Sequence, residues 1–325
     1  MKVCIVGAGA WGSTIGLLLA RKGHEVTLWA RDPGRAAHLE QERENERYLP
    51  GYRFPDGLHA SAEAPPEADF VCGAVPTQYL RGVLERLAPS LPRTPFLSLA
   101  KGIEIESGKL PTEIVREVLG AATPTAVLTG PCIAREIARG LPTAVVVAGD
   151  RATMFQEVFG SPALRVYTSG DRIGAELCSA LKNVLAVAAG IVDGMALGDN
   201  IKGALLTRGI VEMTRLGVAL GAEAHTFTGL AGFGDLFTTC VSPHSRNRGV
   251  GERIGRGETL DAILEGMRSV AEGVPTTRAI VKLARERGVE MPIAGALHAI
   301  LFESVPIEKA LGSLMTRRNR AEGPL

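Results

Sequence analysis

The stretch Lys2–Gly12, with the sequence KVCIVGAGAWG, decides the fold of this chain. Its first five residues predict a short buried strand, and Gly7, Gly9 and Gly12 form a G-x-G-x-x-G pattern that opens a helix. Gly7 permits a tight turn, Gly9 lets backbone N–H groups approach a pyrophosphate, and Gly12 lets the helix pack on the strand. We interpret the stretch as a dinucleotide-binding turn, in preference to a purely structural glycine-rich turn.

The same alternation of strand and helix continues to about residue 170. Strands are predicted at Lys2–Val6, Glu25–Trp29, Asp69–Val75, Pro95–Leu99, Thr125–Leu128, Thr143–Val147 and Leu164–Tyr167. Helices are predicted between most of them, at Ser13–Lys22, Gln78–Leu87, Leu110–Leu119, Cys132–Arg139 and Ala152–Phe159. This pattern is typical of an α/β fold, a Rossmann-like doubly wound parallel sheet that helices cover on both faces.

After residue 171 only helical periodicity remains. Helical segments are predicted near residues 171–196, 200–219, 226–240, 245–255, 259–267, 275–287, 292–303 and 306–316. We therefore expect two domains, a dinucleotide-binding domain over 1–170 and an all-α domain over 171–325 that supplies substrate binding and catalysis.

Composition narrows the class of protein. The 325 residues carry 36 Lys and Arg against 35 Asp and Glu, so no basic surplus points to nucleic acid or a membrane surface as a partner. Five scattered cysteines without a C-x-x-C pair indicate a reducing cytoplasm and no metal site. The N-terminus lacks the apolar run of a secretory signal, and the longest apolar run, 184–192, is shorter than a membrane span.

The residues after the second predicted strand bear on the choice of cofactor. An NAD site usually has an acidic residue there for the ribose 2′-hydroxyl. This chain has Arg31 followed by Asp32. Arg31 can pair with a 2′-phosphate, which favours NADP(H), while Asp32 leaves NAD(H) open. The alternative is that Arg31 is a solvated loop residue.

Lys182 is the only charged residue between Leu177 and Val192, and Asn183 follows it. Burying an unpaired ammonium group is costly, so this lysine either reaches the surface or is retained for function. A nicotinamide cofactor supplies a hydride, and the protein must supply a proton donor for the substrate oxygen. Lys182 is a candidate for that donor, although the residues alone leave both interpretations open.

Three further segments carry polar groups at positions where a ligand could bind. Lys101 follows a predicted strand at its carboxyl end, and Gly130 to Cys132 precede a predicted helix. Each could also be an ordinary loop. The third segment runs from 232 to 248 and concentrates an acid, hydroxyl groups, an amide and two arginines. In it, Arg246 and Asn247 with the Ser245 N–H could clamp a phosphate or carboxylate, or Ser245 could simply cap a helix whose arginines face water.

Taken together, these segments resemble the bacterial type of NAD(P)-dependent glycerol-3-phosphate dehydrogenase. The resemblance covers essentially the whole chain. It rests on the ordered motifs GAGAWG (7–12), YLPG (48–51), AVPT (74–77), AKGIE (100–104), TGPCIARE (129–136), ALKNVLAVAAGIVDG (180–194), GDN (198–200), TRG (207–209), GFGDL (232–236), HSRNR (244–248) and AEGVPTT (271–277).

The resemblance implies reduction of dihydroxyacetone phosphate to sn-glycerol 3-phosphate, a precursor of glycerophospholipids. It implies that Lys182 is the acid/base, that Lys101 contacts substrate and cofactor, and that Asp235 and Asn183 orient Lys182. The substrate set that it implies is Lys101, Gly130, Cys132, Lys182, Asp235, Thr239, Ser245, Arg246 and Asn247. The cofactor set is Gly7, Gly9, Ala10, Trp11, Gly12, Arg31, Asp32, Tyr48, Lys101, Ala134, Arg246, Val270 and Glu272.

Two positions depart from the pattern of this family. Ala10 stands where a serine is usual, and Cys132 stands where a serine or threonine is usual. Backbone donors near Ala10 should still hold a pyrophosphate, while the thiol of Cys132 is a weaker hydrogen-bonding group than a hydroxyl.

Two alternatives are a 3-hydroxy-acid dehydrogenase built like 6-phosphogluconate dehydrogenase and a regulator that senses NAD(P) without turnover. The HSRN and GFGDL segments argue against the dehydrogenase, and the joint presence of Lys182, Asp235 and Arg246 argues against the regulator. The apolar helices of the second half lead us to expect a homodimer.

Overall fold

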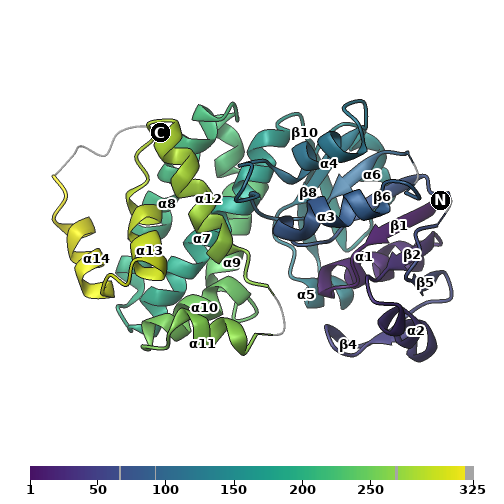
Figure 1. Cartoon of the computed structure of the whole chain (residues 1–325), viewed down its shortest axis with the longest axis horizontal. Coiled ribbons are helices and arrows are strands. Elements are labelled where there is room, and N and C mark those ends of the chain that lie inside the picture. Colours follow the sequence, from purple (N-terminus) through teal and green to yellow (C-terminus); the bar gives the residue numbers. More distant parts are fainter. Residues whose placement is uncertain (66, 92, 268–269, 319–325) are drawn as a thin grey trace. The chain divides into compact units, whose positions relative to one another are not determined.

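A computed structural model describes residues 1–65, 67–91, 93–267 and 270–318. The chain divides into two compact units (Figure 1). The first comprises Met1–Lys101 and Pro111–Arg172, and the second comprises Gly102–Leu110 and Ile173–Leu325. The segment 102–110, which the sequence assigns to the first domain by continuity, thus groups with the second unit.

The described residues of the first unit form one eight-stranded sheet in the order β10-β9-β8-β7-β6-β1-β2-β5. Its strands are β1 (Lys2–Val6), β2 (Glu25–Trp29), β5 (Leu58–Ser61), β6 (Phe70–Gly73), β7 (Phe96–Ser98), β8 (Thr125–Thr129), β9 (Thr143–Gly149) and β10 (Leu164–Ser169). Its helices are α1 (Ala10–Arg21), α2 (Pro33–Glu42), α3 (Thr77–Leu87), α4 (Pro111–Leu119), α5 (Ala134–Ala138) and α6 (Ala152–Phe159). These elements confirm the predicted Rossmann-like α/β fold.

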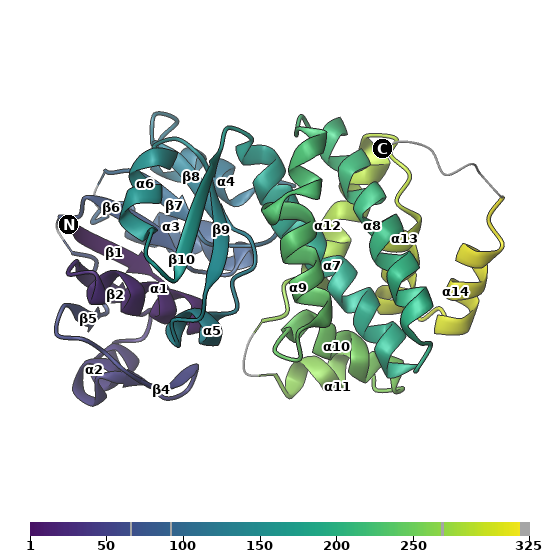
Figure 2. The same cartoon turned by 180° about the vertical axis from the view of Figure 1, so that it is seen from behind.

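Both faces of this sheet are buried. Along β1, Val3 and Ile5 belong to one hydrophobic cluster, whereas Cys4 and Val6 belong to a second. Because successive side chains of a strand point to opposite faces, the two clusters lie on opposite sides of the sheet. Helices accordingly lie on both sides of it (Figure 2).

The prediction of a purely parallel sheet is wrong at one edge. β8 and β9 are antiparallel, while β9 and β10 are parallel to each other. The connection between β8 and β9 contains only the five-residue α5. Such a helix spans about 8 Å, roughly half the length of a five-residue strand, so it cannot carry the chain back to the far end of the sheet. The chain therefore returns from the end at which β8 finishes.

Two features near α2 were not predicted. β5 pairs with β2 at the edge of the sheet, and β3 (Glu44–Asn45) with β4 (Leu49–Arg53) forms a two-stranded antiparallel ribbon. The sequence of β4, LPGYR, contains Pro50 and Gly51, which are typical of a turn and not of a strand. In both views this ribbon lies beside α2 (Figures 1 and 2).

Beyond residue 171, all regular secondary structure among the described residues is helical, as predicted. The helices are α7 (Arg172–Gly194), α8 (Asp199–Ala219), η1 (Ala224–Thr228), η2 (Leu230–Gly234), α9 (Asp235–Val241), α10 (Arg246–Gly255), α11 (Leu260–Glu265), α12 (Gly273–Glu286), α13 (Pro292–Phe302) and α14 (Ile307–Met315). α7 is long and apolar enough to cross a membrane, but 94% of its apolar window is buried in the protein. α7 is therefore the central helix of a protein core, a longer apolar element than the run at 184–192 suggested.

Candidate active site

The dinucleotide turn lies between β1 and α1. Gly7 has φ +118°, and a Cβ there would lie 2.7 Å from the carbonyl oxygen of Ala74, so only glycine fits. A Cβ at Gly12 would lie 1.9 Å from the Gly7 carbonyl oxygen, so the first turn of α1 packs directly on the glycine-rich turn. These two contacts explain why the motif needs glycine at both positions.

The same turn leaves room for a ligand at Gly9. A Cβ on Gly9 would meet no described protein atom within 4 Å, and this N-cap residue has no side chain to satisfy the first N–H groups of α1. The indole N–H of neighbouring Trp11 is buried without a partner among the described residues. A helix N-terminus with open donors suits an anion such as a pyrophosphate, so the residues present fit a bound NAD(P)(H).

The predicted residues after β2 occupy different environments. Arg31 is exposed, and Asp32 is the N-cap of α2, where its side chain accepts a hydrogen bond from the Arg35 N–H at 2.7 Å. Tyr48, between β3 and β4, is half-buried, and the guanidinium carbon of Arg35 lies 4.7 Å from the centre of its ring. Arg35 is not among the predicted site residues, because it lies inside α2 and not directly after the second strand, where a cofactor-selecting residue is usual.

Two predicted substrate residues of the first unit are in contact. Lys101 lies beyond the end of β7, and its Nζ donates a hydrogen bond to the Cys132 sulfur at 2.8 Å. Both side chains are half-buried. Gly130, at the end of β8, has φ +117°, which turns the chain toward Cys132. Ala134 begins α5, and its carbonyl accepts a hydrogen bond from the Thr14 hydroxyl at 3.3 Å, which ties α5 to α1.

Lys182 lies within α7, and its side chain is 6% exposed. It does not reach the surface, so the interpretation of Lys182 as a lysine that extends to solvent is wrong, and its retention for function stays a prediction. Its Nζ forms an ion pair with Asp235 and donates to the Thr239 hydroxyl at 2.9 Å. Thr239 in turn donates to Asp235 at 3.3 Å. A buried ammonium group is stable only when it is paired in this way.

The local helix geometry explains how Asp235 reaches Lys182. The five residues of η2 form a π-helical turn, and Asp235 begins α9 directly after it. π-helical turns change the direction of side chains relative to a regular helix and are frequent at functional sites. Thr239 follows four residues later and lies on the same face of α9. The π-helical turn could not be read from the sequence, because its hydrophobic pattern is that of an ordinary helix.

The segment 245–248 is held on α7 by its backbone and by ion pairs. A Cβ on Gly251 of α10 would lie 1.9 Å from the Val187 carbonyl oxygen of α7, so the two helices pack at backbone distance. Arg248 donates to Asp193 at 2.6 Å. The expectation that Arg248 faces water is therefore wrong, because Asp193 of α7 draws its guanidinium group inward.

Ser245 acts as a helix cap in this structure. Its hydroxyl accepts a hydrogen bond from the Arg248 N–H at 3.3 Å, and its own N–H donates to the Ser242 carbonyl at 3.2 Å. The hypothesis that the Ser245 N–H clamps an anion is thus not supported by this arrangement, because the carbonyl of the preceding turn already accepts from that donor. The roles of Arg246 and Asn247 in substrate binding stay predictions.

Predicted cofactor and substrate residues also meet in the second unit. Arg246 is exposed and donates to the Val270 carbonyl at 3.0 Å. Asn247 is buried, and its side-chain oxygen accepts from the Gly273 N–H at 2.9 Å, next to Glu272. A Cβ on Gly273 would lie 2.4 Å from the carbonyl oxygen of Asn183, so Asn183, Asn247 and the start of α12 pack together.

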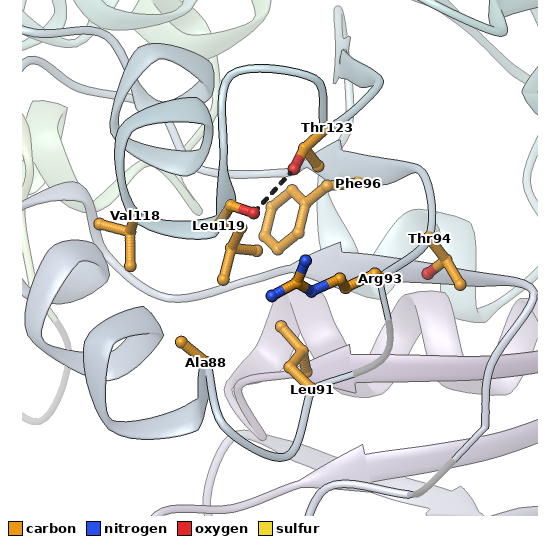
Figure 3. A pocket seen from close by; sticks show the side chains of 8 residues that line it. All are labelled: Ala88, Leu91, Arg93, Thr94, Phe96, Val118, Leu119 and Thr123. Carbon is orange, nitrogen blue, oxygen red and sulfur yellow. Dashed lines mark hydrogen bonds between the residues drawn. The ribbon is translucent and has the colours of Figure 1, made fainter.

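A cavity of about 60 Å³ lies elsewhere in the first unit, near the ends of α3 and α4 (Figure 3). It is lined by Ala88, Leu91, Arg93, Thr94, Phe96, Val118, Leu119 and Thr123. None of the predicted site residues lines it. Small-molecule sites usually enclose ~300 Å³ or more, so this cavity is too small for a dinucleotide.

Comparison with known proteins agrees with this geometry. The family pattern described as "NAD-dependent glycerol-3-phosphate dehydrogenase N-terminus" matches residues 2–155, and its "C-terminus" counterpart matches residues 171–312. A glycerol-3-phosphate dehydrogenase [NAD(P)+] of Chlorobium phaeobacteroides is 47% identical over 331 residues, which cover 99% of each chain. That of Prosthecochloris aestuarii is 45% identical over 331 residues, 99% of this chain and 100% of the relative.

The solved structure of glycerol-3-phosphate dehydrogenase from Coxiella burnetii is similar along nearly the whole chain. It superposes with a TM-score of 0.93 at 36% identity and covers 97% of this chain and 99% of its own. D-mandelate dehydrogenase, at 15% identity and a TM-score of 0.62, shares the fold alone. With both halves matched in sequence and in structure, this chain belongs to the NAD-dependent glycerol-3-phosphate dehydrogenase family.

Proposed function

We propose that the chain reduces dihydroxyacetone phosphate to sn-glycerol 3-phosphate with NAD(P)H and that Lys182 is its general acid. Membership of the family supports the reaction. The single observation that carries the catalytic assignment is the buried group of Lys182, Asp235 and Thr239. The product is a backbone precursor of glycerophospholipids. Neither alternative, the 3-hydroxy-acid dehydrogenase or the non-catalytic sensor, accounts for the family match.

The chemistry follows from the groups that the chain provides. Bound NAD(P)H supplies the hydride. The protein must then supply a proton to the carbonyl oxygen as negative charge develops on it. Lys182 is held as an ammonium group by Asp235, and Thr239 fixes the direction of a second Nζ hydrogen bond. The Lys182 ammonium group provides the proton for the substrate oxygen.

Charge complementarity supports the binding of a phosphorylated ketone. The phosphate is a dianion, and Arg246 offers a guanidinium group that can bind it with two hydrogen bonds. The Lys101 ammonium group, beside the Cys132 thiol, is a second cation suited to substrate or cofactor phosphates. Cys132 in place of a hydroxyl residue should weaken its hydrogen bond to substrate and not prevent binding.

The test compares Lys182→Met with Lys309→Met, which alters an exposed lysine of α14. Oxidation of NADPH and of NADH is followed by absorbance with dihydroxyacetone phosphate as substrate. Because a positioned acid contributes typically 10²–10⁴-fold, kcat of Lys182→Met should fall by about that factor while its Kd for NADPH stays within about twofold. Turnover of Lys182→Met close to that of the Lys309→Met control would refute the role of Lys182.

We also propose that the enzyme is a cytoplasmic homodimer. Its five cysteines are free, and four of them are buried, which suits a reducing compartment. The apolar helices of the second unit favour association with a second copy. Sedimentation equilibrium tests this, because a dimer has twice the 34.3 kDa mass of the chain. A mass of one chain at micromolar concentration would exclude the dimer.

A further inference from the structure

The turn between β3 and β4 brings two arginines to one aromatic ring. The guanidinium carbon of Arg35 lies 4.7 Å from the centre of the Tyr48 ring, and that of Arg47 lies 5.3 Å from it. Arg35 comes from the first half of α2 and is half-buried, whereas Arg47 is exposed. Stacking on an aromatic ring orients a guanidinium group while its N–H donors remain directed outward in the ring plane.

Hydrogen bonds fix this cluster to the dinucleotide turn. Nη2 of Arg35 donates to the Ala8 carbonyl at 3.3 Å and to the side-chain oxygen of Asn45 at 3.0 Å. The Asn45 amide donates to the same Ala8 carbonyl at 3.1 Å and to the Ser13 hydroxyl at 2.7 Å. Ala8 lies between the first two glycines of the motif, so Arg35 is attached to the element that suits a pyrophosphate.

The acidic side chains nearby do not neutralise these arginines. Asp32 is engaged as the N-cap of α2 at 2.7 Å, and Glu44 accepts from the Gly51 N–H at 2.6 Å. Among the described residues, neither Arg35 nor Arg47 forms an ion pair. Burial, and to a lesser extent the charge of Arg47, lower the pKa of Arg35, while Tyr48 and Asp32 act in the opposite direction. A dianion would relieve this repulsion.

We propose that Arg35 and Arg47 bind the 2′-phosphate of NADP(H) and so set the preference of this chain for NADP(H) over NAD(H). The inference rests on the proposed use of a nicotinamide dinucleotide at Gly7–Gly12. In a fold of this type the adenosine ribose lies past the end of the second strand, where α2 begins. A phosphate monoester there can accept two parallel hydrogen bonds from the planar guanidinium group of Arg47, while Arg35, whose Nη2 already donates twice, offers its Nη1 donors and its charge. Arg35 and Arg47 thus join Arg31, which the sequence predicts as a partner of the 2′-phosphate.

The experiment measures binding of the free nucleotides, without substrate and without turnover. Titration calorimetry gives Kd for NADPH, NADH, 2′,5′-ADP and 5′-ADP with the wild type, Arg47→Gln and Arg53→Gln. Arg53 is an exposed arginine of β4 in the same ribbon, so its variant removes the same charge from a neighbouring position. We expect Arg47→Gln to raise the Kd for NADPH and for 2′,5′-ADP about tenfold, which corresponds to ~1.4 kcal/mol of binding free energy. The Kd values for NADH and 5′-ADP should change less than twofold. Arg53→Gln should leave the Kd values of all four nucleotides unchanged.

Arg35 is tested by Arg35→Lys, which keeps a charge but loses the planar fork, because Arg35→Gln could disturb the turn at Ala8. A loss of selectivity for NADPH over NADH is expected again. Equal weakening of NADPH and NADH in both variants would overturn the inference, as would loss of selectivity in Arg31→Gln alone. If the wild type fails to reduce dihydroxyacetone phosphate but selectivity still depends on Arg47, the proposed function fails and the inference stands. The opposite pair of results overturns only the inference.

Discussion

Lys182 and Asp235 carry opposite charges that are both removed from water. The effect of each charge on stability therefore depends on the presence of the other. The side chain of Lys182 is 6% exposed and that of Asp235 is 2% exposed. Removing one partner of a buried ion pair leaves an uncompensated charge, which typically costs about 3–5 kcal/mol. Replacing both partners with apolar residues avoids this cost. An apolar pair could thus serve folding equally well, and the proposed reaction explains why the charged pair is present.

Asp235→Ala should lower the free energy of unfolding by about 3–5 kcal/mol, because it strands the Lys182 ammonium group. Lys182→Met/Asp235→Ala should recover most of that loss and remain inactive. Urea unfolding of the two variants and of the wild type measures both effects. Additive losses in the double variant would show that the two side chains are not coupled.

At the scale of elements, a buried carboxylate of α8 caps α13. Glu212 accepts hydrogen bonds from the Ile293 N–H at 2.8 Å and the Ala294 N–H at 3.4 Å. Burial raises its pKa to about 7, although these two donors and the charges of Arg215 and Arg317 act in the opposite direction. In the unfolded chain the group titrates near its ordinary value of 4.5.

The stability of the wild type relative to Glu212→Gln should therefore depend on pH. Between about pH 4.5 and 7 the folded state binds more protons at Glu212 than the unfolded state, so stability falls as pH rises through this window. Glu212→Gln lacks this titration. Its free energy of unfolding, relative to that of the wild type, should therefore rise by up to ~3 kcal/mol from pH 4 to pH 8. Thermal unfolding of both proteins across this range is the measurement. A constant difference would mean that Glu212 is not buried as a neutral acid.

The contact between α7 and α10 leads to a second prediction at this scale. Gly251→Ala places a Cβ against the Val187 carbonyl, whereas a Cβ on Gly249 of the same helix meets no described atom within 4 Å. Gly251→Ala should push α10 away from α7, destabilise the protein by at least ~1–3 kcal/mol and weaken dihydroxyacetone phosphate binding. Gly249→Ala should instead be neutral or stabilise by ~0.5–1 kcal/mol through its helix propensity. Similar effects of both variants on unfolding would contradict the backbone contact.

Elements with strong periodicity could be predicted from the sequence, and those that depend on chain direction or edge position could not. The strand Lys2–Val6 is apolar on both faces and was predicted with its observed bounds. β5 lies at an edge, so half of its residues are polar, and it has no such pattern. The site residues divide in the same way, into those with a local sequence pattern and those that only the folded chain brings together. Lys182 stands out as a charge on an apolar helix, whereas Arg35 and Arg47 meet only because the ribbon of β3 and β4 folds back beside α2.

For the whole molecule, cofactor binding should be linked to stability. A ligand that binds only the folded state stabilises it by about 2.7 kcal/mol at a hundred times its Kd. Saturating NADPH should therefore raise the melting temperature of the wild type. The Cβ that Gly9→Val adds at the dinucleotide turn would meet no described protein atom within 4 Å, so this variant should melt close to the wild type and lose the shift. A shift that persists in Gly9→Val would mean that NADPH binds elsewhere.

The chain passes from one compact unit to the other three times, after Lys101, after Leu110 and after Arg172. Residues 102–110 belong to the second unit, where the Glu106 carbonyl accepts a hydrogen bond from Lys282 of α12 at 3.4 Å. A gene fragment that starts at residue 173 would encode the second unit without this piece. A single protease cut at the third crossing would divide the second unit, because residues 102–110 would stay on the first fragment. Recombination could therefore exchange these halves between relatives only by moving two separate stretches of coding sequence together.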